Sequence, residues 1–553
     1  MFVGRLEEDD HAGPAERRGV KSVTERLPRA TAASRGVAAD AIERFLDGIA
    51  RAGLELHSFM LVRHGAVAAE GWWSPYRADA PHMLFSLSKS FTSTAVGLAV
   101  ADGLLTVDDF VHSFFPTYAP APLDANLAAM RVRHLLSMST GHERDAQLSR
   151  PGEHADDWIW GFFQEPVVHE PGTHFVYNNG ASYMLSAIVQ QVTGQTVLDY
   201  LGPRVLAPLG IDGATWQTCP RGRNMGGSGL RVKTEDIAKF GLLYLQEGVW
   251  KGQRILSQDW VREATRRHVA NGDDPASDWA QGYGYQFWRC RHGAYRGDGA
   301  FGQFCVIFPE QDAVLAITAG VSQLQGVLDE VFAHLLPGMD DAAAAPASAS
   351  RGALETRLSG LALPPVGGGQ PHPHKVPGAR YRIADNEWGF TAVAFAWTED
   401  GCTVTFAKDG RKGGATDSAT DGAKAGATNS ATDLATDGGT DGATDSATDG
   451  AQVRATEGAA DEGGQEISCG FSHYVHGTSS FAGRSEPVAA SCEWSGSDTL
   501  VAVLRFIETP FVVTLTFVFS GETLRATSVV NVSFGAKEQF SLEGRLDAAD
   551  AAG

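Results

Sequence analysis

A buried helix that begins near Ser86 constrains this chain more than any other stretch. The run over residues 95–100 holds only small and apolar residues, so a helix here needs cover on every side. Residues three apart on a helix share a face, with Cβ atoms about 5–6 Å apart. Lys89 follows Ser86 by three residues, and an unpartnered ammonium among apolar neighbours is costly. The spacing predicts that Lys89 reaches the Ser86 hydroxyl.

A serine beside a lysine can supply the nucleophile and the base of an acyl-transfer enzyme. A serine hydroxyl is a poor nucleophile until a base removes its proton, and a lysine accepts one only when it is partly neutral, which desolvation favours. Of the ten lysines in the chain, only Lys89 has a serine three residues before it. A surface serine near a solvated lysine is the alternative. Seryl hydrolase chemistry is therefore the leading hypothesis.

The pattern up to residue 338 mixes helices and strands. Residues 39–54 place apolar side chains on one helical stripe, and residues 59–69 and 303–318 each predict a hairpin of apolar strands. Strands near both ends with helices between them predict an α/β (α+β) unit over residues 37–338. We expect an antiparallel sheet flanked by helices, with a helical insertion. Residues 1–36 are expected to form a polar N-terminal arm.

The character of the sequence changes after residue 338. Residues 339–374 are rich in Ala, Pro, Gly and Ser and predict a linker. Short alternating β-branched segments over residues 375–548 predict a small all-β barrel or sandwich. Ala-Thr-Asp-Gly/Ser repeats interrupt this domain over residues 411–465 and hold almost no large apolar residues, so a disordered insert is expected. A calcium-binding repeat is the alternative, although the period of four lacks the apolar positions of a β-roll.

Composition excludes several functions. A net charge of −21 without a basic patch argues against nucleic acid as a partner. No stretch approaches the about 18–20 apolar residues of a membrane span, and the N-terminus is acidic where a signal peptide would be basic. Six cysteines without a Cys-x-x-Cys pair are expected to be reduced and buried. We expect a cytoplasmic protein with no cofactor, no metal and no membrane contact, and leave its oligomeric state open.

Two further segments carry groups that such chemistry needs. Tyr177 and Asn179 precede a predicted helix, where a tyrosine can exchange protons with Ser86 and an asparagine can hold Lys89 or a substrate amide. A turn tyrosine and a helix-capping asparagine are the alternative. The glycine-rich stretch Gly297-Asp298-Gly299-Ala300 allows close backbone approach, and the N–H groups of Ala300 and Ser86 can form an oxyanion hole. Here the alternative is a simple glycine-rich turn.

The order and spacing of these three segments resemble the serine β-lactamase and penicillin-binding-protein-like superfamily over roughly residues 38–338. The most similar branch is that of the class C β-lactamase-like hydrolases, which includes esterases, D-aminopeptidases and nylon-oligomer hydrolases. The resemblance implies an acyl-enzyme at Ser86, Lys89 as base, Tyr177 as general acid/base and Asn179 as an orienting group. It also implies a small ester, amide or D-amino-acid peptide as substrate.

The third segment departs from the family pattern. The family usually has Lys, His or Trp where this chain has Gly297, and a true β-lactamase uses a cation there to hold the substrate carboxylate. Arg296 is adjacent, but strand alternation predicts that it points to the opposite face. An esterase or amidase is therefore favoured. A true β-lactamase and a non-catalytic or slowly acylating ligand-binding sensor on the same fold remain the alternatives.

Overall fold

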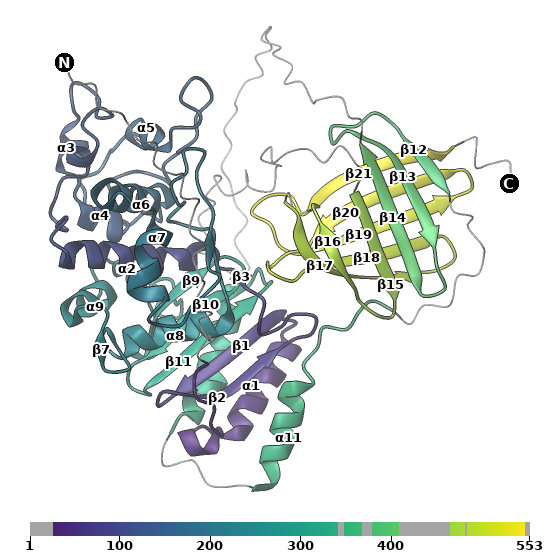
Figure 1. Cartoon of the computed structure of the whole chain (residues 1–553), viewed down its shortest axis with the longest axis horizontal. Helices are drawn as coiled ribbons and strands as arrows, with labels where there is room; N and C mark the ends of the chain where they lie inside the picture. The colour runs from purple at the N-terminus through teal and green to yellow at the C-terminus, as the bar shows by residue number, and fades with distance from the viewer. Residues whose placement is uncertain (1–25, 341–347, 368–378, 409–464, 482–483, 548–553) are drawn as a thin grey trace, which may run out of the picture.

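The computed structural model describes residues 26–340, 348–367, 379–408, 465–481 and 484–547. Figure 1 shows a mixed helix-and-strand unit beside an all-β barrel. The predicted insert over residues 411–465 lies outside the described residues except for its last residue, and so does most of the predicted N-terminal arm. The described end of that arm packs on the mixed unit, where Leu27 is buried and Arg29 pairs with Glu70 and Glu235.

The mixed unit is built on a six-stranded antiparallel sheet. In spatial order its strands are β2 (Ala66–Trp72), β1 (Leu56–Arg63), β11 (Ala313–Ala319), β10 (Gln303–Phe308), β9 (Tyr295–Gly299) and β8 (Trp288–Arg289). Both predicted hairpins are present, as β1–β2 and β10–β11. The central pair β1–β11 joins strands from the two ends of the unit, so segments far apart in the sequence pair directly in the sheet.

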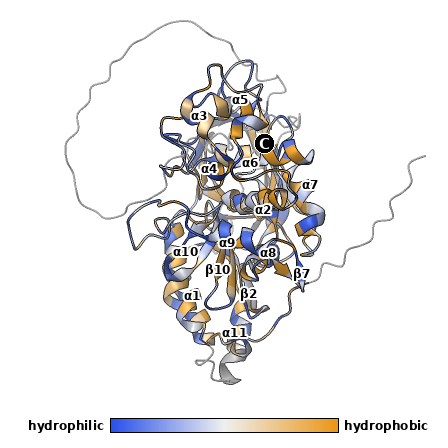
Figure 2. Cartoon of the chain, turned by 90° about the vertical axis from the view of Figure 1, so that its left-hand side faces the viewer, coloured by the Kyte–Doolittle hydropathy of each residue, from blue (hydrophilic) through white to orange (hydrophobic). Residues whose placement is uncertain are grey.

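Helices cover both faces of this sheet because its strands alternate between two apolar cores. Met60 and Val62 belong to the core under α2, α6 and α8, whereas Phe59 and Leu61 belong to the core under α1 and α10. In Figure 2 the outer helices α1 and α10 mix hydrophilic and hydrophobic residues. The predicted α/β (α+β) fold with an antiparallel sheet flanked by helices is confirmed.

The helices are α1 (Ala39–Arg51), α2 (Ser88–Ala101), α3 (Ala125–Ala129), α4 (Val132–Leu136), α5 (Trp158–Phe163), α6 (Asn179–Thr193), α7 (Val197–Leu201), α8 (Thr234–Leu245), α9 (Gln258–Thr265), α10 (Leu324–Glu330) and α11 (Ser348–Ser359). Short strands β3 (His82–Met83), β5 (Leu230–Val232) and β4 (Thr215–Trp216) form a second sheet, and β6 (Val249–Trp250) pairs with β7 (Gln253–Arg254). Helices α3 to α7 form the predicted helical insertion. Helix α2 is buried at every residue from Ser88 to Ala99, as its composition predicts.

The predicted linker over residues 339–374 holds a structural element that its composition did not indicate. Helix α11 contacts α1 and β2, and its Leu354 is buried in the core of the mixed unit. Arg357 on the same helix pairs with Asp47 on α1. Leu354, Leu358 and Arg357 therefore dock a segment whose overall composition is typical of linkers.

The C-terminal strands form a closed barrel, which decides between the barrel and the sandwich that the sequence allowed. They are β12 (Arg380–Ile383), β13 (Phe390–Trp397), β14 (Gly401–Lys408), β15 (Gln465–Phe471), β16 (Val475–Ser479), β17 (Glu486–Trp494), β18 (Thr499–Phe506), β19 (Val512–Ser520), β20 (Thr523–Val530) and β21 (Glu538–Leu546). Nine of them form the ring, because β15 pairs with β17, and β16 lies at the edge of β17. The contact that closes the ring is short, with Gly470 opposite Ser491 and Phe471 opposite Cys492.

Ion pairs join the barrel to the mixed unit. Arg231 on β5 forms a bidentate pair with Glu486 on β17, at 2.6 and 2.5 Å, and both side chains are about nine-tenths buried. Arg505 on β18 pairs with Glu55 beside β1 at 2.7 Å. Buried pairs of this kind orient two bodies because removing one partner leaves the other charge without compensation.

All six cysteines are buried and form no disulfide, and the Sγ atoms of Cys402 and Cys492 share a hydrogen bond at 3.7 Å. Within the described ranges, none of the helices combines the length and apolarity that a membrane crossing requires.

We expect Glu486→Gln to lower the free energy of unfolding by about 2 kcal/mol, because it replaces a charged acceptor of a buried arginine. The change in melting temperature of the purified protein measures this. Glu466→Gln is the control, because Glu466 is an exposed carboxylate on β15 of the same barrel. Equal melting temperatures for the two variants would contradict a structural role for the Arg231–Glu486 pair.

Candidate active site

Ser86 lies in a single 3-10 turn, η2 (Phe85–Leu87), which leads directly into α2. Lys89 is in the first turn of that helix and is 1% exposed. Its Nζ lies 2.9 Å from Ser86 Oγ, so the structure brings together the two residues that the spacing pairs. This contact is local because both groups lie within one turn of chain.

Two distant segments complete the surroundings of the Lys89 amine. Nζ donates to Asn179 Oδ1 at 2.6 Å and to the Gly227 carbonyl oxygen at 2.8 Å. Together with Ser86 Oγ, these give one oxygen for each of the three N–H groups of an ammonium. The three oxygens are uncharged, and Gly227 was not among the residues that the sequence singled out.

Asp145 holds Asn179 in place. Its Oδ2 accepts from Asn179 Nδ2 at 2.8 Å, and its Oδ1 accepts from the Asn179 backbone N–H at 2.7 Å and from the Gly180 N–H at 3.3 Å. A carboxylate at the start of α6 also complements the positive end of the helix dipole. Since the amide nitrogen is engaged by Asp145, the amide oxygen is the atom that faces Lys89. No local pattern marks Asp145 in the sequence.

The ring of Tyr177 covers the amine from a further side. Its centroid lies 4.7 Å from Lys89 Nζ, and the ring stacks on Trp288 with centroids 5.3 Å apart and an interplanar angle of 23°. Tyr283 meets it edge-on. The structure therefore groups Ser86, Lys89, Tyr177 and Asn179, and it adds Trp288 as a residue that orients the tyrosine.

The end of β9 passes close to the turn that carries the serine. A Cβ on Gly299 would lie 2.0 Å from the Leu84 carbonyl oxygen, so only glycine fits there. A Cβ on Gly297 would lie 2.5 Å from both Leu87 Cδ1 and Ser90 Oγ on the nucleophile's own helix. A side chain at position 297 would therefore require Leu87 and Ser90 to shift. Ala300 follows immediately and is half-buried.

Asp298 points toward Arg296, away from Gly297, as strand alternation predicts. The Arg296 Nε lies 2.9 Å from Asp298 Oδ2, and both residues are buried. Burial raises the pKa of the Asp298 carboxyl, and the Arg296 charge opposes that rise. Arg296 also lies over Trp288, with its guanidinium carbon 5.6 Å from the ring centroid. This ion pair therefore supports the tryptophan against which Tyr177 stacks.

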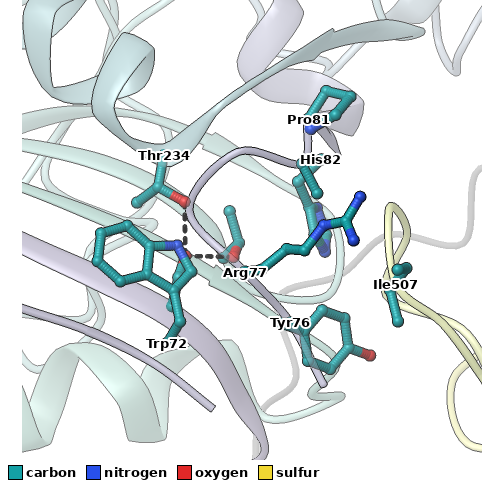
Figure 3. Close-up of a pocket in the computed structure, with 10 residues that line it drawn as sticks. Trp72, Tyr76, Arg77, Pro81, His82, Thr234 and Ile507 are labelled. Carbon is teal, nitrogen blue, oxygen red and sulfur yellow. Dashed lines mark hydrogen bonds between the residues drawn. The ribbon is translucent and has the colours of Figure 1, made fainter. Parts of the chain in front are cut away.

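A small pocket elsewhere in the mixed unit reaches the barrel through Ile507 (Figure 3). Ser58 lines it, and its Oγ bonds Thr234 Oγ1 at 2.7 Å and Thr318 Oγ1 at 2.6 Å. Hydroxyls that bond one another lack the base that a nucleophile needs. Its lining includes none of the predicted catalytic residues, and no group of three metal-ligating side chains was found among the residues that the structure describes.

We expect Asp145→Ala to lower kcat about tenfold, because Asn179 then loses the acceptor that turns its oxygen toward Lys89. Glu143→Ala is the matched control, since its carboxylate is 72% exposed and bonds His169 instead. Steady-state kinetics of both variants with a chromogenic ester measure the effect. An Asp145 variant as active as the Glu143 variant would contradict this orienting role.

Comparison with known proteins identifies the family of this chain. The β-lactamase family model matches residues 38–330. The 6-aminohexanoate-dimer hydrolase of Paenarthrobacter ureafaciens is 26% identical over 280 residues, which cover 47% of this chain and 71% of that protein. Lovastatin esterase of Penicillium rubens is 29% identical over 159 residues, covering 25% of this chain and 40% of the esterase. The octameric penicillin-binding protein homologue of Pyrococcus abyssi is a similar solved structure, with 14% identity, a TM-score of 0.43 and coverage of 91% of this chain and 99% of its own. The family match spans more than half of the sequence, and the chain therefore belongs to the β-lactamase family.

Proposed function

We propose that this protein is a serine hydrolase that acts through an acyl-enzyme at Ser86 on a small ester, amide or D-amino-acid peptide. The observation that carries the proposal is the 2.9 Å contact between Ser86 Oγ and the Nζ of a fully buried lysine. Desolvation disfavours the charged form of an amine, so this lysine is suited to accept the serine proton. The names of the two relatives, a dimer hydrolase and an esterase, agree with this class of reaction.

The reaction begins when Ser86 Oγ attacks the substrate carbonyl carbon and its proton passes to Lys89 Nζ. The carbonyl oxygen becomes an oxyanion, which the N–H groups of Ser86 and Ala300 stabilise. The C–O or C–N bond to the leaving group then breaks, and the leaving group takes the proton from Lys89 directly or through the Tyr177 hydroxyl. Water attacks the acyl-enzyme by the reverse sequence, which releases the acid and restores Ser86.

We expect Ser86→Ala to abolish turnover and to prevent labelling by a fluorescent serine-directed phosphonate, because the attacking oxygen is removed. Lys89→Met should lower kcat by about 10²–10⁴-fold, the usual size of general-base catalysis. Mass spectrometry of the labelled peptide locates the modified residue. Ser93→Ala is the control, because Ser93 is a buried serine on the same helix.

The same labelling separates the hydrolase from a non-catalytic sensor. Absence of label on a folded wild-type protein would favour the ligand-binding alternative. Label that persists on Ser86→Ala would refute the assigned nucleophile. Label that forms on wild type but is not followed by ester turnover would indicate slow deacylation, which is the behaviour of a sensor.

We expect p-nitrophenyl acetate to be hydrolysed with a kcat/KM at least about tenfold to a hundredfold above that for nitrocefin. Gly297 supplies no cation for a β-lactam carboxylate, and a charge-assisted hydrogen bond is worth about 1.5–3 kcal/mol. The two rates are compared by absorbance at equal enzyme concentration, with Ser86→Ala as the blank. A nitrocefin rate equal to the ester rate would support the true β-lactamase alternative instead.

A further inference from the structure

Two bulky residues with left-handed backbone flank the proposed oxyanion hole. Phe85 precedes Ser86 with φ +47°, and Phe301 follows Ala300 with φ +66°. Side chains of this size rarely adopt positive φ, and such a conformation persists only where the surrounding structure holds it. Each strained residue is next to a residue whose N–H is proposed to face the oxyanion. The ψ angle of Phe85 orients the peptide plane that carries the Ser86 N–H, and Phe301 fixes the chain immediately after Ala300, so what holds these two residues bears on the position of both N–H groups.

The barrel supplies the groups that hold them. The rings of Phe85 and Phe301 meet edge-to-face with centroids 5.3 Å apart. Phe511 lies 6.1 Å from Phe85 and 6.0 Å from Phe301, and Phe534 lies 6.1 and 4.8 Å from the same two rings. Val532 is buried in the same cluster. We call these five residues the aromatic clasp.

Hydrogen bonds anchor the two barrel loops that carry the clasp. In the loop between β18 and β19, the Glu508 carbonyl oxygen accepts from the Met83 N–H at 2.8 Å, close to Phe85 in the chain. In the loop between β20 and β21, Asn531 Nδ2 donates to the Gly320 carbonyl oxygen at 3.3 Å and to the Pro510 carbonyl oxygen at 3.0 Å. Asn531 therefore ties the two loops to each other and to the end of β11.

We propose that the barrel completes the oxyanion hole, with Phe511 and Phe534 acting as positioning residues for the N–H groups of Ser86 and Ala300. The inference rests on the proposed function, since it concerns the same acyl-transfer site. The C-terminal barrel, which lies outside the matched family region, would then contribute to catalysis. Phe511 and Phe534 act through the backbone of Phe85 and Phe301 and need no contact with substrate.

Phe534→Ala tests the proposal with little risk to folding, because Phe534 is 38% exposed. We expect kcat for p-nitrophenyl acetate to fall about tenfold with KM within twofold, since loss of one oxyanion donor costs about 10²–10³-fold and a misdirected donor costs less. Phe511→Ala should act in the same direction, and Phe511→Leu should recover part of the rate. Val529→Ala, which truncates an exposed apolar residue on β20, is the matched control and should keep the full rate.

Inhibition by two boronic acids distinguishes positioning from direct substrate contact. A boronate on Ser86 presents a charged tetrahedral oxygen, so its Ki should rise by the same factor as kcat falls, for methylboronic and phenylboronic acid alike. Weakening of phenylboronic acid alone would overturn the proposal and make the clasp a wall of the substrate site. Unchanged kcat in both alanine variants would also overturn it. Failure of the proposed function itself would appear separately, as wild-type protein that the phosphonate does not label.

Discussion

The buried amine of Lys89 needs hydrogen-bond partners, and distant segments of the chain must come together to supply them. Lys89 lies on a helix that is covered on all sides, and each N–H of its amine needs an oxygen nearby. Those oxygens belong to Ser86, Asn179 and Gly227, which lie on three segments far apart in the sequence. The helical insertion and the approach to β5 must therefore meet α2 at one point. The contacts that bring these segments together in the mixed unit are also the contacts that build the candidate site.

Two charged groups hold the residues that surround this amine, and the buried Asp298 carboxylate also interacts electrostatically with Lys89 itself. Asp145 engages the nitrogen of the Asn179 amide, and the amide oxygen then faces Lys89. On the other side, the Arg296–Asp298 pair lies beneath Trp288, which stacks on Tyr177. The atoms that hydrogen-bond Lys89 Nζ are the uncharged oxygens of Ser86, Asn179 and Gly227. This arrangement gives each N–H of the buried amine an oxygen partner.

The barrel is joined to the mixed unit through interactions of different kinds. Ion pairs at Arg231 and Arg505 bury charges at the interface, and the aromatic clasp packs barrel side chains on Phe85 and Phe301. In our proposal the ion pairs orient the barrel, and the aromatic contacts restrain the backbone of Phe85 and Phe301. Helix α11 adds a third connection by docking on α1 and β2. The C-terminal part of the chain is therefore integrated with the site.

Local patterns in the sequence predicted much of this protein. The two hairpins follow from apolar runs across polar turns, and the helix at Ser86 follows from its composition. The pairing of Ser86 with Lys89 is local, because three residues of helix determine it. Tyr177 and Asn179 were identified from their place before a helix and from resemblance. The barrel followed from short alternating strands, although closure required the β15–β17 pairing that no local pattern encodes.

Only the tertiary structure decided which distant groups complete the site. Asp145 lies in a loop without a motif, and Gly227 contributes a backbone carbonyl at a position where a Cβ would lie 3.4 Å from Lys89 Nζ. Phe511 and Phe534 look like ordinary loop aromatics until the barrel brings them against Phe85. The physical reason is the distance along the chain between the groups in contact. Periodicity and spacing predict contacts between residues a few positions apart. The partners of a buried polar group or of a strained backbone segment come from distant parts of the sequence, so only the completed fold determines them.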